Sequence, residues 1–169
     1  NAGMLYQDSI EVSELHYPLR VYDKRLVADS EGPGTYNGAP SSTAEYGPVD
    51  CSMEINFVSD GCQNPPRGVR GGGTGGNAQQ YRRRVDGSLQ TLPGVPSTTL
   101  APGERILAVT CGGGGYGSPL QREPRRVAHN AREGWITRKR AAEVYGVILN
   151  ESFEVDENET RRKRAELAG

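Results

Sequence analysis

A run of four glycines followed by Tyr116 is the feature of this sequence with the clearest potential for chemistry. Residues 112–117 read Gly-Gly-Gly-Gly-Tyr-Gly and come directly after Cys111 and an apolar segment at 105–110. Glycine loses more conformational entropy on folding than any other residue, so such a run indicates that the backbone needs positive φ or that another group approaches it closely. We therefore expect either a binding site or a tight packing contact at 112–117.

The glycines do not predict a nucleotide-binding motif. The spacing at 112–117 matches the dinucleotide fingerprint and follows a strand-like segment, but Pro119 and Pro124 interrupt the helix that should begin at once. No acidic residue ends a second strand about 20 residues further on. A second match at 71–76 has no strand before it, and the Gly-Lys-Ser/Thr of a P-loop does not occur. The sequence therefore predicts no ATP site within this chain.

The cysteines and histidines do not indicate a catalytic or metal-binding set. A nucleophilic cysteine needs a base and an orienting group, and neither His16 nor His129 can be placed beside Cys111 from the sequence. We interpret Cys111 as an inert, buried or half-buried thiol. Two histidines are too few for a histidine-based metal site, and we expect no metal, although a mixed site with Asp or Glu stays open. The odd count of three cysteines is typical of a reduced cytosolic protein, with a Cys51–Cys62 bridge as the alternative.

Three polar segments each have two interpretations. Residues 29–34, Asp-Ser-Glu-Gly-Pro-Gly, either present carboxylates to a metal or substrate, or form a capped turn in which Asp29 and Ser30 bond nearby backbone amides. Residues 82–84 are three arginines that form a solvated edge strand or contact an interface or anion. Residues 133–146 resemble a helix-turn-helix, but no recognition-type third helix follows. We expect instead a helical hairpin that packs on a sheet, with Trp135 as its anchor.

Length and composition bound the class of protein. A chain of 169 residues suits one domain, and 23 Gly with 11 Pro predict many turns and loops. The net charge of -1 gives no bulk attraction to nucleic acid or to an anionic membrane. No apolar run is long enough to span a bilayer and no signal peptide is present, so we expect a cytoplasmic protein without nucleic-acid or membrane partners.

The periodicity of the sequence places strands first and helices last. Alternation predicts strands at 15–21, 43–46, 52–59, 77–85 and 105–110, with hairpin-type turns at 86–87 and 102–103. Helical spacing and caps predict a helix from Pro124 to Gly134, a second at 138–145 capped by Thr137, and a charged helix at 160–167 capped by Asp156 or Asn158. We therefore predict an α+β fold, β-rich over 1–118 and mainly helical over 119–169, as one domain or as the C-terminal fragment of a larger subunit.

Several of these segments together resemble the hydantoinase B/oxoprolinase family. The likeness is carried by the glycines with the Tyr-Gly-Ser-Pro-Leu-Gln-Arg-Glu-Pro that follows them, by Val-Tyr-Gly-Val at 144–147, by Tyr-Pro-Leu-Arg-Val at 17–21 and by Pro-Gly-Glu-Arg at 102–105. It spans nearly the whole chain in the right order. Glu31 stands where the family usually has Gly, and Ser118 replaces its usual Asp.

The resemblance implies an activity that this chain shares with other polypeptides. Members work with an A-type subunit that uses ATP, and together they open cyclic amides such as hydantoins or 5-oxoproline; related complexes carboxylate ketones. ATP and a divalent metal are implied for the whole complex, and none is expected on this chain alone. Family B-type subunits are several times longer, and this chain starts at Asn1 without Met. The resemblance therefore implies a C-terminal portion whose partners are the remaining B-type segment and an A-type subunit.

The resemblance also assigns a role to the glycine run. We expect an active-site or substrate-binding loop that consists of Gly112, Gly113, Gly114, Gly115 and Tyr116, while the catalytic residues stay unassigned. Two other functions remain open at this point. One is a subunit or fragment of an ATP-dependent ketone carboxylase of the same superfamily, and the other is a non-catalytic binding module that uses the hairpin at 123–147.

Overall fold

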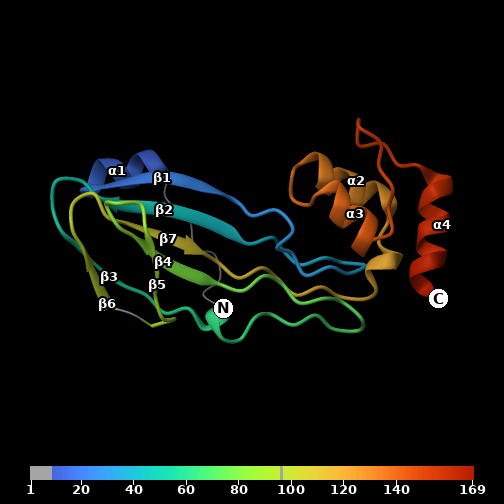
Figure 1. Ribbon diagram of the computed structural model, residues 1–169, viewed down its shortest axis with the longest axis horizontal. Coiled ribbons are helices and arrows are strands. Elements are labelled where there is room, and N and C mark those ends of the chain that lie inside the picture. Colours follow the sequence, from blue (N-terminus) through green and yellow to red (C-terminus); the bar gives the residue numbers. More distant parts are fainter. Residues whose placement is uncertain (1–8, 96) are drawn as a thin grey trace.

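The predicted α+β fold is confirmed by the computed structural model, which describes residues 9–95 and 97–169. Residues 1–8, which belong to the predicted unit 1–169, lie outside the described residues. Figure 1 shows the strands gathered at one end of an elongated molecule, three helices at the other, and long connecting segments between them. None of the helices in the described residues has the length and hydropathy that a bilayer crossing requires.

The strands form two antiparallel sheets. The larger sheet has the order β1-β2-β7-β4-β5 and the smaller one pairs β3 with β6. The strands are β1 (Leu19–Leu26), β2 (Ser42–Pro48), β3 (Met53–Asn56), β4 (Gln79–Arg83), β5 (Leu89–Thr91), β6 (Ser97–Leu100) and β7 (Arg105–Val109). The turn predicted at 86–87 joins β4 to β5, as expected for a hairpin.

The two sheets meet in a small apolar core. Alternate residues of a strand face opposite sides, so Ile106 of β7 points to the smaller sheet, where it meets Ile55 and Leu100. All three side chains are buried, and Phe57 packs against them. This core holds the sheets together at the end of the molecule that is remote from the helices (Figure 1).

The helices begin and end where their caps predicted. α2 (Pro124–Arg132) starts at a proline, and α3 (Arg138–Val144) is capped by Thr137, whose hydroxyl accepts from the amide of Arg140 at 3.0 Å. Asp156 accepts from two amides at the start of α4 (Glu157–Ala168). Two short 3-10 turns, η1 (Asp60–Cys62) and η2 (Pro119–Gln121), lie in the connections.

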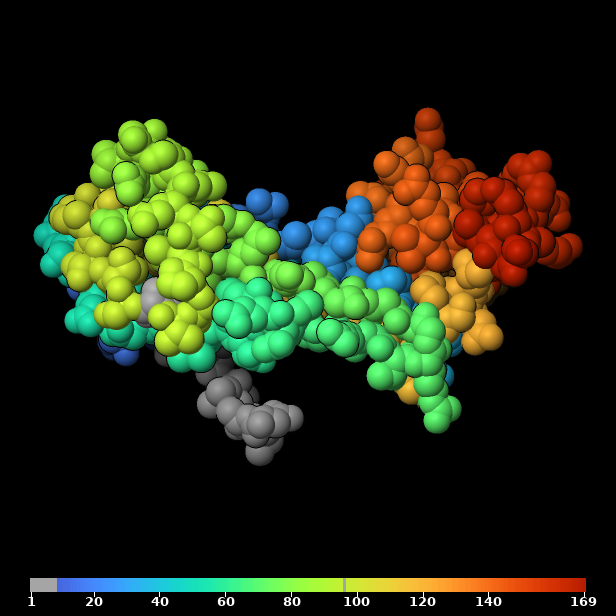
Figure 2. All heavy atoms as spheres, turned by 60° about the horizontal axis from the view of Figure 1, so that its bottom comes forward, coloured from blue at the N-terminus to red at the C-terminus, as the bar shows by residue number. Residues whose placement is uncertain are grey.

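The helices enclose a second core of their own. Its fully buried members come from α2, α3 and the segments that follow each of them: Val127, Ala131, Ile136, Ala141, Tyr145 and Val147. Figure 2 shows the sheet region and the helical region (residues 119–169) as two protrusions on either side of a lower middle part. The molecule therefore has two separate cores.

Three structural expectations are wrong. The segment before Leu19 is a helix, α1 (Ile10–His16), rather than part of a strand, because Ser9 caps it and Pro18 separates it from β1. Strand β4 lies between β7 and β5, so the arginines at 82–84 are not on an edge. The helical hairpin lies away from the sheets (Figure 1), and its buried anchor is Ile136, since Trp135 is half-buried.

Candidate functional site

The glycine run is one of three glycine-rich segments that pack together between the sheets and the helices. We call residues 30–39, 66–76 and 112–117 the glycine bundle. Backbone hydrogen bonds join all three: Gly32 donates to Gly113 (2.8 Å), Gly115 to Gly73 (2.9 Å), and Gly73 to Pro33 (2.6 Å). The bundle thus consists of extended backbones bonded side by side, with few side chains between them.

Glycine is required here because the backbones approach too closely for a Cβ atom. A Cβ on Gly115 would lie 2.0 Å from the carbonyl oxygen of Pro33, and one on Gly38 would lie 2.0 Å from that of Gly113. The same steric logic restricts the axis of the collagen triple helix to glycine. Positive φ is the reason only at Gly117, where φ is 73°. The expectation of a tight packing contact is therefore confirmed for this run.

The hydrogen bonding of the bundle bears on what the run can bind. The amides of Gly112, Gly113 and Gly115 donate to the carbonyls of Gly76 (2.9 Å), Ala39 (2.8 Å) and Gly73 (2.9 Å). A phosphate-binding loop needs free amides that point at the anion. These three amides are already used, so they do not form a phosphate cradle.

Tyr116 is the predicted site residue whose side chain reaches the surface. Its backbone pairs with Tyr36 through bonds of 2.8 and 3.0 Å, and the two rings lie 6.3 Å apart at 55°. The guanidinium of Arg70 lies 5.8 Å from the Tyr116 ring. Both tyrosines are exposed, Tyr36 at 62% and Tyr116 at 44%. The bundle therefore presents a rigid aromatic surface, while Gly112 and Gly115 are buried and Gly113 and Gly114 half-buried.

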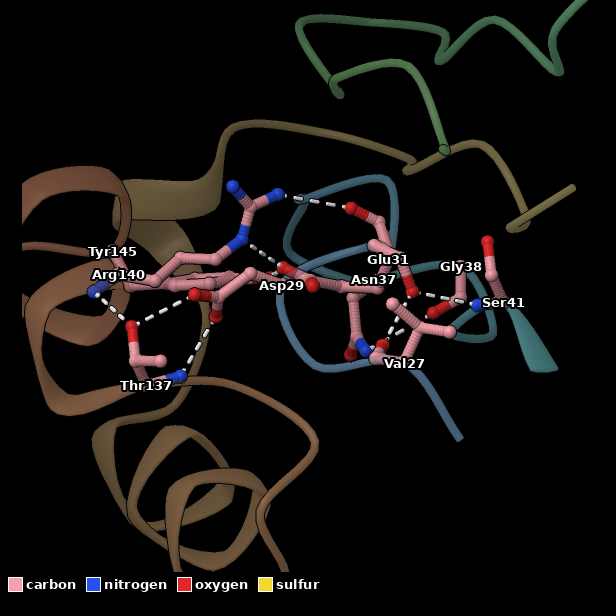
Figure 3. Close-up of polar contacts among 10 residues, drawn as sticks. Val27, Asp29, Glu31, Asn37, Gly38, Ser41, Thr137, Arg140 and Tyr145 are labelled. Carbon is pink, nitrogen blue, oxygen red and sulfur yellow. Dashed lines mark hydrogen bonds and ion pairs between the residues drawn. The ribbon is translucent and has the colours of Figure 1, made fainter. Parts of the chain in front are cut away.

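A buried polar cluster joins the bundle to the helical region (Figure 3). The carboxylate of Glu31, a residue only 2% exposed, accepts from Nε of Arg140 at 2.7 Å and from the hydroxyl of Tyr145 at 2.8 Å. Arg140 also donates to the carbonyl of Glu31 at 3.0 Å. Burial, and then the neighbouring Glu31 carboxylate, raises the pKa of Tyr145, so its hydroxyl stays a donor at all ordinary pH values. We call these three residues the Glu31 cluster.

The neighbouring acid binds the same hairpin. Asp29 accepts from the amide of Thr137 at 2.7 Å and from its hydroxyl at 2.9 Å (Figure 3), so it fixes the start of α3. Ser30 accepts from the amide of Ser41 at 2.7 Å and donates to Val27 at 2.5 Å. Residues 29–34 therefore connect the bundle to the helices, which neither interpretation of this segment anticipated for Asp29.

The three arginines of β4 are engaged within the sheet. Arg82 binds both carboxylate oxygens of Glu104, and its Nε lies 3.0 Å from Oε1. Arg83 binds Glu45 at 2.8 Å. Arg84 donates to Gln90. Their main role in the described structure is internal pairing.

The remaining candidates form no metal site in the described part of the chain. Cys51, Cys62 and Cys111 are all free and half-buried, so the alternative of a Cys51–Cys62 bridge is wrong. Within residues 9–95 and 97–169, no three His, Cys, Asp or Glu side chains gather as metal ligands would. Asp29 and Glu31 are engaged by Thr137, Arg140 and Tyr145, as described above. The residues present therefore do not fit a divalent metal.

Sequence reasoning missed the Glu31 cluster because its members are about 110 positions apart. A signal did exist: Glu31 interrupts a run of small turn residues, and an acid at such a position, once buried, requires a cation or hydroxyl elsewhere. The position of that partner could not be inferred from spacing. Oε2 of Glu31 has no hydrogen-bond partner in the described structure.

Comparison with known proteins agrees with the predicted family. The model of the family "Hydantoinase B/oxoprolinase" matches residues 1–119. The chain is 31% identical to the beta subunit of caprolactamase from Pseudomonas jessenii over 96% of its length, and 34% identical to the B-type subunit of a putative D-/L-hydantoinase from Pseudomonas sp. (strain NS671) over 92%. It spans only 29% and 26% of these two relatives. A shorter match, 40% identity over 60 residues, joins 33% of the chain to 8% of the acetone carboxylase alpha subunit of Xanthobacter autotrophicus.

Two solved structures share the fold. The crystal structure of ATP-dependent caprolactamase from Pseudomonas jessenii superimposes with a TM-score of 0.77 at 30% identity, over 93% of this chain and 28% of that one. A nucleotide-free structure of acetone carboxylase gives a TM-score of 0.79 at 21% identity, over 95% of this chain and 26% of that one. At 21% identity the second match speaks for the fold alone.

Proposed function

This chain belongs to the hydantoinase B/oxoprolinase family, and we propose that it forms the C-terminal portion of a B-type subunit of an ATP-dependent cyclic-amide hydrolase. The observation that carries the proposal is the alignment of nearly the whole chain with the caprolactamase beta subunit. Caprolactam and hydantoins both contain a cyclic amide, which is the bond that such an enzyme opens. The substrate of this protein is then a small cyclic amide.

The chain acts, in this proposal, only together with partner polypeptides. The relatives are subunits, and this chain spans under a third of each of the two named first. The remaining B-type segment and an A-type subunit supply the other parts of the active site. ATP and a divalent metal belong to the whole complex, where ATP activates the amide oxygen by phosphoryl transfer before hydrolysis. The chain's own described residues contribute neither a metal site nor a phosphate cradle.

The glycine bundle supports the active site in this proposal, and Tyr116 is its member that reaches a neighbour or substrate. Three hydrogen-bonded backbones hold Tyr36 and Tyr116 without relying on flexible side chains. Tyrosine provides a large contact area at low entropic cost, which suits such a position. Gly112–Gly115 then act by permitting the close packing, and Tyr116 by contact.

The test is to assemble this chain with the remaining B-type segment and an A-type subunit and to measure ATP-dependent opening of caprolactam, hydantoin and 5-oxoproline. We expect turnover by the complex and none by the isolated chain. Tyr116→Ala should lower turnover about tenfold or more, because misplacing a substrate or neighbour by a small distance is costly. Tyr22→Ala is the matched control, since Tyr22 is exposed to the same extent (43% against 44%) but lies on β1. ATP-dependent hydrolysis by the isolated chain would refute the proposal.

The second candidate function is ATP-dependent ketone carboxylation, which the match to the acetone carboxylase alpha subunit favours. The same assembled complex distinguishes the two. Bicarbonate-dependent ATP turnover with acetone, in the absence of cyclic-amide opening, would assign the chain to a carboxylase instead.

A further inference from the structure

A crevice in the helical region lies far from the glycine run in the sequence and has no role in the proposed reaction. It has a volume of 260 Å³ and lies between α2 and the tight turn that follows Asn150. We call it the α2 crevice. Its lining residues are Arg125, Ala128, His129, Arg132, Phe153, Glu154 and Val155.

The α2 crevice combines an apolar floor with a cationic rim. Ala128, Phe153 and Val155 supply the apolar groups. Arg125, His129 and Arg132 are spaced i, i+4 and i+7, so they share one face of α2. Both arginines and His129 are exposed. A hydrophobic stripe would be expected where a helix meets its own core, so cations at this spacing indicate a surface that faces something else.

Phe153 is held in an unusual conformation at the floor of the crevice. Its φ is 60°, which is rare for a bulky residue and costs about 1 kcal/mol or more. Asn150 maintains this turn: its side-chain oxygen accepts from the amides of Ser152 and Glu154, both at 2.9 Å. The guanidinium of Arg138 lies 6.0 Å from the Phe153 ring. The strain is stored where an aromatic ring is presented next to cations.

The cations around Phe153 are not neutralised within the described part of the molecule. No acidic side chain there forms an ion pair with Arg125, Arg132 or Arg138, although neighbouring Arg126 pairs with Glu123 and Lys139 with Glu143. Glu154, which also lines the crevice, accepts from the side chain of Asn150 at 2.9 Å. The crevice therefore carries uncompensated positive charge beside an apolar floor.

We propose that the α2 crevice is a docking site for an acidic segment of a partner protein that inserts one apolar side chain between its carboxylates. The distance along α2 from Arg125 to Arg132 is about 10 Å at 1.5 Å per residue. One carboxylate cannot reach both arginines, whereas about three residues of extended chain span this length. The volume lies below the roughly 300–1,000 Å³ of small-molecule sites, which suits a single side chain. Charge complementarity therefore identifies the partner as acidic, and the floor requires an apolar anchor.

The proposal can be tested on the full chain with a labelled peptide of sequence acetyl-Glu-Glu-Leu-Glu-Glu-amide. We expect saturable binding that weakens with added salt, and NMR shifts centred on Phe153. The double variant Arg125→Gln/Arg132→Gln should lower the affinity about five- to tenfold, since two exposed ion pairs are lost. Arg126→Gln, on another face of the same helix, should leave the affinity unchanged. Phe153→Asn, which tolerates positive φ, should weaken binding by removing the floor while a thermal melt confirms folding.

The control ligands decide the class of partner. The peptide with Gln in place of each Glu, and the peptide with Ser in place of Leu, should each bind more weakly than the parent. Equal binding of the parent peptide by the double variant and the unaltered chain would overturn the proposal. Tighter binding of duplex DNA or of free phenylacetate than of the peptide would overturn it as well. None of these measurements involves amide opening, so failure here leaves the proposed activity untouched.

Discussion

Glu31 is the residue whose environment explains the largest part of how this molecule is joined together. It is buried, it accepts hydrogen bonds from Arg140 and Tyr145, and its backbone lies within the glycine bundle. A buried carboxylate is tolerated only when a cation and hydrogen-bond donors face it. The same residue that departs from the family's usual glycine therefore makes the polar link between the bundle and the helices.

Replacing this carboxylate should destabilise the protein markedly. Glu31→Gln leaves the guanidinium of Arg140 without its counter-ion, so we expect a loss of about 2–4 kcal/mol in the free energy of unfolding, measured with urea. Lys139→Gln is the matched control, because Lys139 precedes Arg140 and makes only an exposed 4.0 Å pair with Glu143. Its loss should stay below about 0.5 kcal/mol. Equal effects of the two substitutions would contradict this role for Glu31.

Glu104 gives a prediction about acid stability. Its hydrogen bonds to Arg82, and then to the amide of Ala101, lower the pKa of Glu104 below its ordinary value of 4.5. Because the pKa is lower in the folded state, the resulting stabilisation is present above about pH 4.5 and is lost as the pH falls through the folded-state value. Glu104→Gln should cost about 1–2 kcal/mol at pH 7, and the difference from the unaltered chain should shrink towards pH 3.

Urea titrations between pH 7 and pH 3 check this expectation. Glu133→Gln serves as the control, since Glu133 is exposed at the end of α2. A constant difference between Glu104→Gln and the unaltered chain at every pH would show that the Arg82–Glu104 pair does not contribute through ionisation.

The glycine bundle is the element that distinguishes this fold from an ordinary pair of sheets with helices. It is neither helix nor strand, and its three segments are stabilised by hydrogen bonds between backbones that are adjacent only in space. The close contact of these backbones depends on the missing side chains at Gly38, Gly72 and Gly115. A single added methyl group therefore has no room there.

Gly115→Ala should disrupt the bundle and cost about 3 kcal/mol or more, because its Cβ would meet a carbonyl at 2.0 Å. Gly134→Ala separates this steric effect from conformational strain: nothing lies within 4 Å of its Cβ position, but its φ is 71°. We expect that control to cost about 1–2 kcal/mol from backbone strain alone. Denaturant unfolding of both variants is the measurement, and an equal cost at the two positions would show that close packing is not what requires glycine at 115.

The whole molecule has two apolar cores with a polar and glycine-rich connection between them. One core lies between the sheets around Ile106, and the other lies among the helices around Tyr145. Cooperative unfolding requires that the parts stabilise one another strongly. Here the link consists of the Glu31 cluster, the Asp29–Thr137 bonds and the bundle itself (Figures 1 and 3).

We therefore expect the two regions to unfold separately. Trp135 is the single tryptophan and lies in the helical region, so its fluorescence reports on that region alone. Its urea transition should not coincide with the transition that far-ultraviolet circular dichroism detects for the whole chain. Glu31→Gln should widen the gap between the two. Superimposable transitions would show that the connection transmits full cooperativity.

How much was readable from the sequence depends on how local each signal is. The α+β class, the helices at 124 and 138 with their caps, the hairpin turn at 86–87 and the family were all predictable, because capping residues, turn residues and motifs act within a few positions. The glycine run was identified as either a site or a tight contact for the same reason. Its role as an active-site loop stays a prediction that the assembled enzyme will test.

Long-range pairing decided the rest. Only the tertiary structure brings Glu31 to Arg140 and Tyr145, puts β4 inside the sheet, and aligns three glycine segments so closely that a Cβ cannot fit. The sequence determined that the backbone at 112–117 must be approached closely, since it carries no side chains there. Which backbones approach it depends on chain segments 40 to 80 positions away, and spacing along the chain holds no information about that distance.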